Sequence, residues 1–248
     1  VRAVECRGQL TVQDTTVPII PDDDIQGDKG RALLKIHPIT SSDITNRVYD
    51  NVVTKAASAQ NDSLIVRVDG TLDSDNIQIT MYNNTYENSK TSSFLYGGTI
   101  YGHQLGKLRI SETQDGPCIL TPGLNQTGVE WGGDATSGYT LSITAPDSYK
   151  LMDDVTISSM TVSAKDAVID GNKDTYTLTL SGTKAQQGVI TVNNGATLQN
   201  LNVVAAEDAA FGTAIMVNSG NLTDSTIDLS NQNAQPSSDT GRMSAIAV

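Results

Sequence analysis

The feature that most constrains the fold is a short motif that returns at a fixed spacing in the C-terminal half of the chain. The segment VNNG at 192–195 returns as VNSG at 217–220, an offset of 25. A coil of three short strands and three turns takes a little more than about 20 residues, so a period of this length predicts a three-sided parallel β-helix. Equivalent side chains then stack at the strand spacing of about 4.8 Å. The predicted stacks are Ile190 on Ile215, Val192 on Val217 and Asn193 on Asn218.

The stacked asparagines predict a ladder at a corner of the coil, because side-chain amides hydrogen-bond along such a stack and asparagine tolerates left-handed backbone. The same offset places Val155 on Leu180 and Ile143 on Val168. Two other interpretations stay open. Val, Asn and Gly are abundant enough here to recur by chance, and the strands also fit a continuing antiparallel sandwich.

The chain changes its pattern near residue 132, which predicts two domains, 1–132 and 133–248. Residues 1–132 hold both cysteines, both histidines and most of the aromatic and basic residues. Alternating apolar and polar residues predict strands there, most clearly at 9–13, 32–37, 63–68, 76–82 and 107–111. The stretch 41–60 is the one predicted helix, because serines able to cap it precede apolar residues near helical spacing. We expect an all-β fold: an N-terminal β-sandwich-like domain with one helix, followed by the β-helix.

The two cysteines, Cys6 and Cys118, predict a structural disulfide that staples the N-terminal domain. No CxxC spacing occurs, and His37 and His103 form no ligand pattern, so a redox pair or a metal site is disfavoured. Closing a loop of about a hundred residues stabilises a fold by about 4–5 kcal/mol in the chain-entropy model. Such a bond also predicts export through an oxidising compartment.

The charge of the chain argues against nucleic acid as a partner. The net charge is −12, and a surface of that sign repels phosphate backbones. Acidity also has a simpler interpretation, solubility outside the cell. No apolar run approaches the roughly 20 residues that span a bilayer. No basic segment followed by a hydrophobic core begins the chain, so we expect that any signal peptide has been removed.

Aromatic residues beside glycines are the candidate ligand-binding group. Phe94, Tyr96 and Tyr101 flank Gly97-Gly98, and aromatic faces near polar groups suit both sugar stacking and protein contacts. Ordinary core packing is the competing explanation. Trp131 is expected to cap the first turn of the β-helix. The run 22–24 of three aspartates is expected to be a solvated turn rather than a calcium loop, and His37 a structural residue.

Catalysis receives little support from the sequence. Cleavage of acidic sugars needs paired carboxylates at a fixed separation, or calcium with a basic proton acceptor. The candidates are Asp153, Asp154, Asp166, Asp170 and Asp174. Adjacent aspartates on a strand point to opposite faces, and the β-helical region has almost no arginine. We therefore expect no enzyme activity, no cofactor and no metal.

The segment GVITVNNGATLQNLNVV at 188–204 resembles the strand repeats of autotransporter-passenger adhesins and other secreted right-handed β-helix surface proteins, in which VIDGN, here at 168–172, is also common. This resemblance covers the chain from about Tyr139 onward and implies architecture; the N-terminal domain resembles no family. We expect the protein to be a non-catalytic bacterial cell-surface adhesin that binds host glycan or protein. A phage tailspike or secreted polysaccharide lyase or hydrolase, and a structural filament or coat subunit, are the alternatives. The apolar strand Ser244–Val248 has no polar cap, which predicts self-association or a partner subunit at the C-terminal end.

Overall fold

The computed structural model describes residues 2–6, 9–19, 32–36, 44–55, 64–68, 77–87, 107–124, 126–181, 188–232 and 244–248. All regular secondary structure in these segments is β-strand, and no helix occurs in them. None of these segments therefore forms a helix able to cross a membrane. The chain divides into two compact units, Val1–Gly116 and Pro117–Val248. The predicted boundary between residues 132 and 133 falls inside the second unit.

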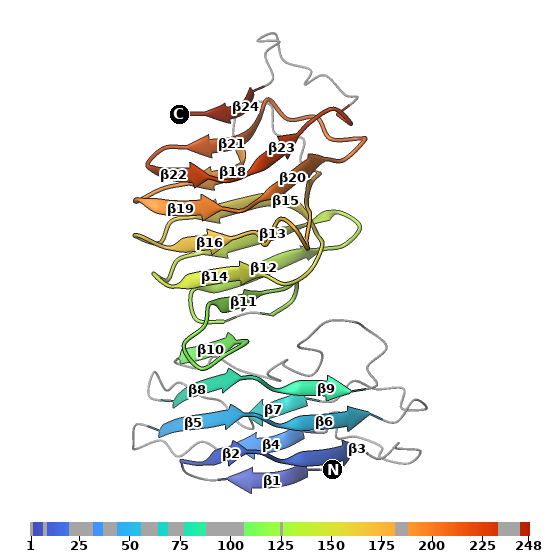
Figure 1. The fold of residues 1–248 in the computed structure, drawn as a ribbon, viewed down its shortest axis with the longest axis vertical. Coiled ribbons are helices and arrows are strands. Elements are labelled where there is room, and N and C mark those ends of the chain that lie inside the picture. The colour runs from blue at the N-terminus through green and yellow to red at the C-terminus, as the bar shows by residue number, and fades with distance from the viewer. Residues whose placement is uncertain are drawn as a thin grey trace. The chain divides into compact units, whose positions relative to one another are not determined.

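Unit 1 is built from parallel strands arranged in three sheets (Figure 1). The strands are β1 (Arg2–Cys6), β2 (Thr11–Gln13), β3 (Thr16–Ile19), β4 (Ala32–Ile36), β5 (Ile44–Tyr49), β6 (Val52–Lys55), β7 (Leu64–Val68), β8 (Ile77–Tyr82), β9 (Thr85–Glu87) and β10 (Lys107–Ser111). The sheet orders are β1-β4-β7, β2-β5-β8-β10 and β3-β6-β9. Each sheet takes one strand from each pass of the chain, which is consistent with a β-helix or solenoid-like fold.

Residues 1–132 were predicted to form a β-sandwich-like domain; the described strands of unit 1 are all β, as predicted, but they pair in parallel and do not form a sandwich. Five strands, β2, β4, β7, β8 and β10, lie where strands were predicted, because alternation of apolar and polar residues identifies a half-buried strand. Alternation does not reveal the partner, however, and it is the same for parallel and antiparallel pairing. Here each partner lies a whole coil away: Val12 pairs with Val48, and Val48 pairs with Met81.

The helix predicted at 41–60 is also wrong. The part of this stretch that the structure describes, 44–55, consists of strands β5 and β6 separated by a corner at Asp50 and Asn51. Asp50 has left-handed backbone, with φ 54°, and this turns the chain sharply between the two strands. The apolar residues that mimic helical spacing are two period-2 sets placed on either side of that corner, and most of them are β-branched, which favours strand over helix.

Unit 2 has the same all-β organisation. Its strands are β11 (Cys118–Leu120), β12 (Val129–Asp134), β13 (Gly138–Ile143), β14 (Ser148–Leu151), β15 (Val155–Val162), β16 (Val168–Asp170), β17 (Leu178–Leu180), β18 (Gly188–Val192), β19 (Ala196–Gln199), β20 (Asn202–Ala205), β21 (Thr213–Val217), β22 (Gly220–Thr223), β23 (Thr226–Asp228) and β24 (Ser244–Ala247). One face has the order β11-β14-β16-β19-β22.

The long strand β15 joins the two other faces of unit 2. Its first half pairs with β17, which leads to β20 and β23, and its second half pairs with β18, which leads to β21 and β24. All of these pairings are parallel. The exception is the hairpin of β12 and β13, which is antiparallel, although β13 then pairs in parallel with β15.

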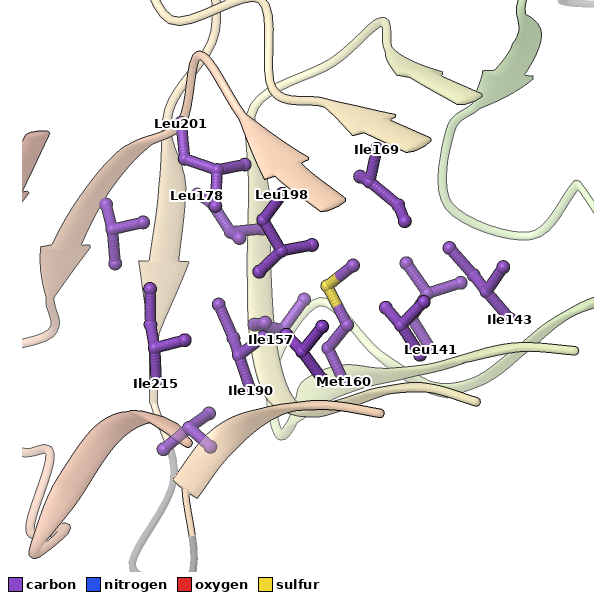
Figure 2. Close-up of a cluster of buried hydrophobic side chains, with 14 of the residues drawn as sticks. Leu141, Ile143, Ile157, Met160, Ile169, Leu178, Ile190, Leu198, Leu201 and Ile215 are labelled. Carbon is purple, nitrogen blue, oxygen red and sulfur yellow. The ribbon is translucent and has the colours of Figure 1, made fainter. Parts of the chain in front are cut away.

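The interior of unit 2 is an aliphatic stack, as Figure 2 shows. Ile190 pairs with Ile215 and Val192 with Val217, and all four are buried. The offset that relates these two coils does not hold further back, because Val155 pairs with Leu178 and Ile143 with Val162. Coils therefore differ in length while their strands stay in register. Burying each such side chain contributes about 1.5–3 kcal/mol of hydrophobic stabilisation.

The predicted Cys6–Cys118 disulfide is not seen. Cys118 lies in β11 as a buried thiol whose Sγ is 3.3 Å from Asp147 Oδ2. Cys6 ends β1, and its side chain lies outside the described residues. The two cysteines belong to different units, so the bond would not close the single N-terminal domain that was expected to need it. Cys118 therefore gives no indication of an oxidising compartment.

Candidate functional site

The outward side of the β2-β5-β8-β10 sheet in unit 1 carries the most chemically distinctive surface of the described residues. The side chains that point inward from these four strands are buried and, apart from Asn46, apolar: Val12, Val48, Ile79, Met81 and Ile110. Because successive side chains of a strand point to opposite faces, the residues between them face outward. They form two rows that run across the strands.

The first row places two tyrosines directly above one another. Gln13, Tyr49, Tyr82 and Ser111 are register partners on the four successive strands. The Tyr49 and Tyr82 rings are stacked, with centroids 4.7 Å apart and an interplanar angle of 6°. That separation is the strand spacing itself, so the backbone register holds the rings in contact. The Tyr49 hydroxyl donates to Gln13 Oε1.

The electrostatic surroundings of Tyr82 reflect this packing. Burial is the largest cause that raises the pKa of its phenol, followed by the neighbouring Tyr49 and the charge of Asp50. The positive charge of Arg47 acts in the opposite direction. Tyr82 therefore stays a neutral hydrogen-bond donor and acceptor at physiological pH.

The second row contains two arginines with different surroundings. Thr11, Arg47, Thr80 and Arg109 are register partners. Arg109 is half-buried and donates to Ser111 Oγ at 3.1 Å and to the Gly116 carbonyl at 2.5 Å. Arg47 is exposed, and its guanidinium forms no hydrogen bond or ion pair with any residue that the structure describes. We call the surface made by Arg47, Tyr49, Thr80, Tyr82 and Arg109 the tyrosine–arginine face.

A buried asparagine ladder fixes the edge of this face. Asn51 and Asn84 follow the left-handed corner residues Asp50 and Asn83. Asn51 Nδ2 donates to Asn84 Oδ1 at 2.9 Å and to the Val12 carbonyl at 3.0 Å, and Asn51 Oδ1 accepts from the Thr15 amide at 3.1 Å. These bonds join three successive coils. They satisfy backbone groups that the sharp corner would otherwise leave unpaired.

The tyrosine–arginine face suits non-covalent recognition. Stacked phenol rings offer a rigid amphipathic surface that loses little side-chain entropy on binding, and a guanidinium offers a planar fork of donors. Sequence reasoning missed this face, although a signal exists. The segments VQDTTV at 12–17, VYDNVV at 48–53 and MYNNTY at 81–86 align strand, corner and strand. Their offsets of 36 and 33 differ from each other and from the 25 of the C-terminal repeat.

The residues selected from sequence as a ligand-binding group, Phe94, Tyr96 and Tyr101, lie outside the described residues, as do both histidines and the aspartates at 22–24. Trp131 lies in β12, packs against the core of unit 2 and contacts Tyr139 edge-to-face, with ring centroids 6.0 Å apart. The predicted asparagine ladder has Asn218 Nδ2 donating to Asn193 Oδ1 at 3.0 Å. This second ladder is exposed, unlike the one in unit 1.

The candidate catalytic carboxylates of unit 2 do not form an acid–base pair around Asp170. Its carboxylate accepts hydrogen bonds from Gln199 Nε2 at 3.0 Å, from Asn200 Nδ2 at 2.9 Å and from the Asn172 amide at 2.8 Å. Burial raises the pKa of this carboxyl, but these hydrogen bonds and the charge of Lys150 outweigh burial, so the pKa lies below its ordinary value. Asp170 is therefore a structural acceptor between coils rather than a proton donor.

The neighbouring pair Asp153 and Asp154 lies at the corner between β14 and β15. Burial raises the pKa of Asp153; a hydrogen bond from the Asp154 backbone lowers it and the charge of Asp154 raises it, and the effect of burial is the largest. Asp154 Oδ1 accepts from the Thr177 amide at 2.7 Å, which holds that carboxylate to the next coil. Among the described residues, no three histidine, cysteine or acidic side chains gather in a group that would hold a metal ion.

Comparison with known proteins finds no match: no protein family, no curated protein and no solved structure matches this chain.

Proposed function

We propose that the protein is a non-catalytic bacterial surface adhesin whose right-handed parallel β-helix presents the tyrosine–arginine face to a host glycan or surface protein. On this proposal it acts outside the cell after export. The observation that carries the proposal is the combination on one outward face of two stacked tyrosines and an exposed arginine without a described partner. Tyrosine and arginine are, together with tryptophan, the residues most enriched among the hot spots of protein–protein interfaces.

The arrangement of the face supports binding rather than catalysis. Its rows repeat at the strand spacing of about 4.8 Å, so it offers regularly spaced polar and aromatic groups to an extended ligand. Repetition across coils is typical of solenoid proteins that bind through a broad surface. A hydrolase or lyase would instead need a proton donor beside a second charged group, and the hydrogen bonds to Asp170 favour its ionised form.

The alternative is polysaccharide cleavage, and one observation keeps it worth testing: the raised pKa of Asp153 next to Asp154. General acid catalysis uses a carboxyl whose pKa is raised in this way. If Asp153 is a catalytic acid, incubating the protein with bacterial capsule or plant polysaccharides releases reducing ends, and Asp153→Asn abolishes the release. The adhesin proposal expects no release from either protein.

Adhesion is tested by titrating the fluorescently labelled full chain onto cultured epithelial cells. The expected result is saturable binding that unlabelled protein competes away. A parallel titration after removal of surface glycans, and another after mild proteolysis of the cells, separates a glycan from a protein receptor. Binding that is linear with concentration and insensitive to competitor would contradict adhesion.

A further inference from the structure

We propose that the tyrosine–arginine face recognises a carboxylated sugar carried on an otherwise neutral glycan, with Arg47 as the carboxylate partner and Tyr49 and Tyr82 as the sugar contact. This inference rests on the proposed function and specifies its ligand. It assigns a chemical role to each row of the face. The tyrosine row supplies a rigid platform, and the arginine row supplies the charge that selects an acid.

The guanidinium of Arg47, unlike that of Arg109, is open to a ligand. Arg109, in the same row, is half-buried and donates to Ser111 and Gly116, so it is already engaged by neighbouring residues. Arg47 is exposed and has no such partner among the described residues. A guanidinium matches a carboxylate with two parallel N–H···O bonds, which are shorter and stronger than bonds between neutral groups. The donors of Arg47 are therefore available for a ligand.

The neighbouring tyrosines make that arginine specific for a sugar acid rather than for any anion. Arg47 lies two residues before Tyr49 on β5, so both side chains are on the same outward side of the strand, beside the stacked pair. The outer edges of the rings offer apolar contact to the C–H groups of a sugar, and the Tyr82 hydroxyl offers a hydrogen bond. The stack is held by backbone register, so binding orders few side chains and loses little entropy.

The charge of the whole chain argues against a dense polyanion as the ligand. The net charge is −12, from 28 acidic and 16 basic residues, and Asp14 and Asp50 lie at the corner beside the face. Such a field repels a heavily sulfated or polyuronic chain at long range. A single carboxylate is different, because a hydrogen-bonded contact to Arg47 acts well within the Debye length of about 8 Å at physiological salt.

The size of the face suits a short oligosaccharide. Four strands at the usual spacing cover about 14 Å from β2 to β10. A glycan lying across the strands would contact Gln13, Tyr49 and Tyr82 in turn, which are register partners, whereas Ser111 at the β10 end of the row is buried. The carboxylated unit would lie at the β5 level, where Arg47 and Tyr49 share the same outward side of one strand.

The inference is tested by isothermal titration of the full chain with three probes: sialyllactose, lactose and a heparin oligosaccharide. We expect sialyllactose to bind at least about tenfold more tightly than lactose, and the heparin oligosaccharide to bind more weakly than sialyllactose. Arg47→Ala should remove the preference for sialyllactose over lactose. Arg47→Lys keeps the charge but not the planar fork, so it should restore only part of the preference.

Two further variants complete the test. Tyr82→Ala should weaken sialyllactose and lactose by the same factor, because it removes the sugar contact and not the acid contact. Lys165→Ala is the matched control: Lys165 lies in unit 2 with its side chain 83% exposed, and its removal changes the net charge as Arg47→Ala does. It should leave both affinities unchanged. Circular dichroism of every variant checks that the strands remain.

The outcomes separate this inference from the proposed function. Equal affinity for sialyllactose and lactose, unaffected by Arg47→Ala, overturns the carboxylated ligand, while saturable cell binding would still support adhesion. Tighter binding of the heparin oligosaccharide than of sialyllactose also overturns it. Sialyllactose selectivity lost in Arg47→Ala, together with no binding to cells, supports the sugar site and contradicts adhesion.

Discussion

Replacing Asn51 with alanine tests whether the buried asparagine ladder holds the coils of unit 1 together. Asn51 is fully buried, and its side chain is the partner of the Thr15 amide and of the Val12 carbonyl. Asn51→Ala leaves both backbone groups without that partner. Each unsatisfied buried group costs about 1–3 kcal/mol, so we expect the free energy of unfolding to fall by about 2–5 kcal/mol, with a small cavity adding to the loss.

The measurement is urea unfolding of the full chain, followed for unit 1 by the near-ultraviolet circular dichroism of the tyrosine stack. With a slope of about 2 kcal/mol per molar urea, the expected loss lowers the midpoint by about 1–2.5 M. Asn218→Ala is the matched control, because Asn218 is an exposed ladder asparagine with one side-chain bond of 3.0 Å. We expect it to lose less than about 1 kcal/mol. An Asn51→Ala midpoint shift no larger than that of Asn218→Ala would refute the role of the buried ladder.

Three further predictions follow from described contacts. Gly123→Ala and Gly128→Ala both place a Cβ on left-handed backbone, with φ 79° and 71°, which costs about 1–2 kcal/mol in each case. Gly128→Ala should lower the free energy of unfolding, measured by heat or urea, clearly more than Gly123→Ala. The reason is that the new Cβ at Gly128 collides with Ala145, whose N lies 2.5 Å away, whereas the new Cβ at Gly123 has no atom within 4 Å. Leu198 is fully buried in the core of unit 2, so Leu198→Ala should lower the free energy of unfolding by about 2–5 kcal/mol. Ile246 is 46% exposed, so Ile246→Ala should lower it by far less. Equal losses would contradict the burial of Leu198 in this core. The pKa of Asp170 is lowered in the folded protein. Its carboxylate therefore stabilises the protein at pH values above its unfolded pKa, and this contribution disappears as the pH falls through its folded pKa. Asp170→Asn should reduce the loss of stability between about pH 5 and pH 2, and an unchanged dependence of stability on pH would contradict this.

The sequence predicts much of unit 2 because two of its coils happen to repeat closely. Ile190 and Ile215 are neighbours in space and occupy equivalent places in recognisable segments, VITVNNG and AIMVNSG. In unit 1 the corresponding signal is spread over two unequal offsets, 36 and 33. Its shared elements are a left-handed corner and an asparagine or threonine, rather than a string of identical residues. The strands of unit 1 can still be located in the sequence, but their positions do not show whether they pair in parallel or antiparallel.

Sequence reasoning missed the candidate site for a related reason. Tyr49 and Tyr82 are a whole coil apart along the chain, and nothing local marks either as a surface residue. Their contact exists only because β5 and β8 pair in the register that places one over the other. A group of aromatic residues next to glycines can be recognised in a sequence because its members are close together along the chain. A face made across coils becomes visible only once the register is known.

The unequal length of the coils means that the solenoid can accept insertions without rebuilding its core. Tyr149 pairs with Ile169, Ile190 with Ile215, and Ile215 with Ile246, so the stretch of chain between partners lengthens from each of these pairs to the next. The paired residues stay in register although the number of residues between them differs. Evolution can therefore lengthen or replace one corner at a time, so lineages of such a protein would diverge fastest at their corners while the buried rows change slowly.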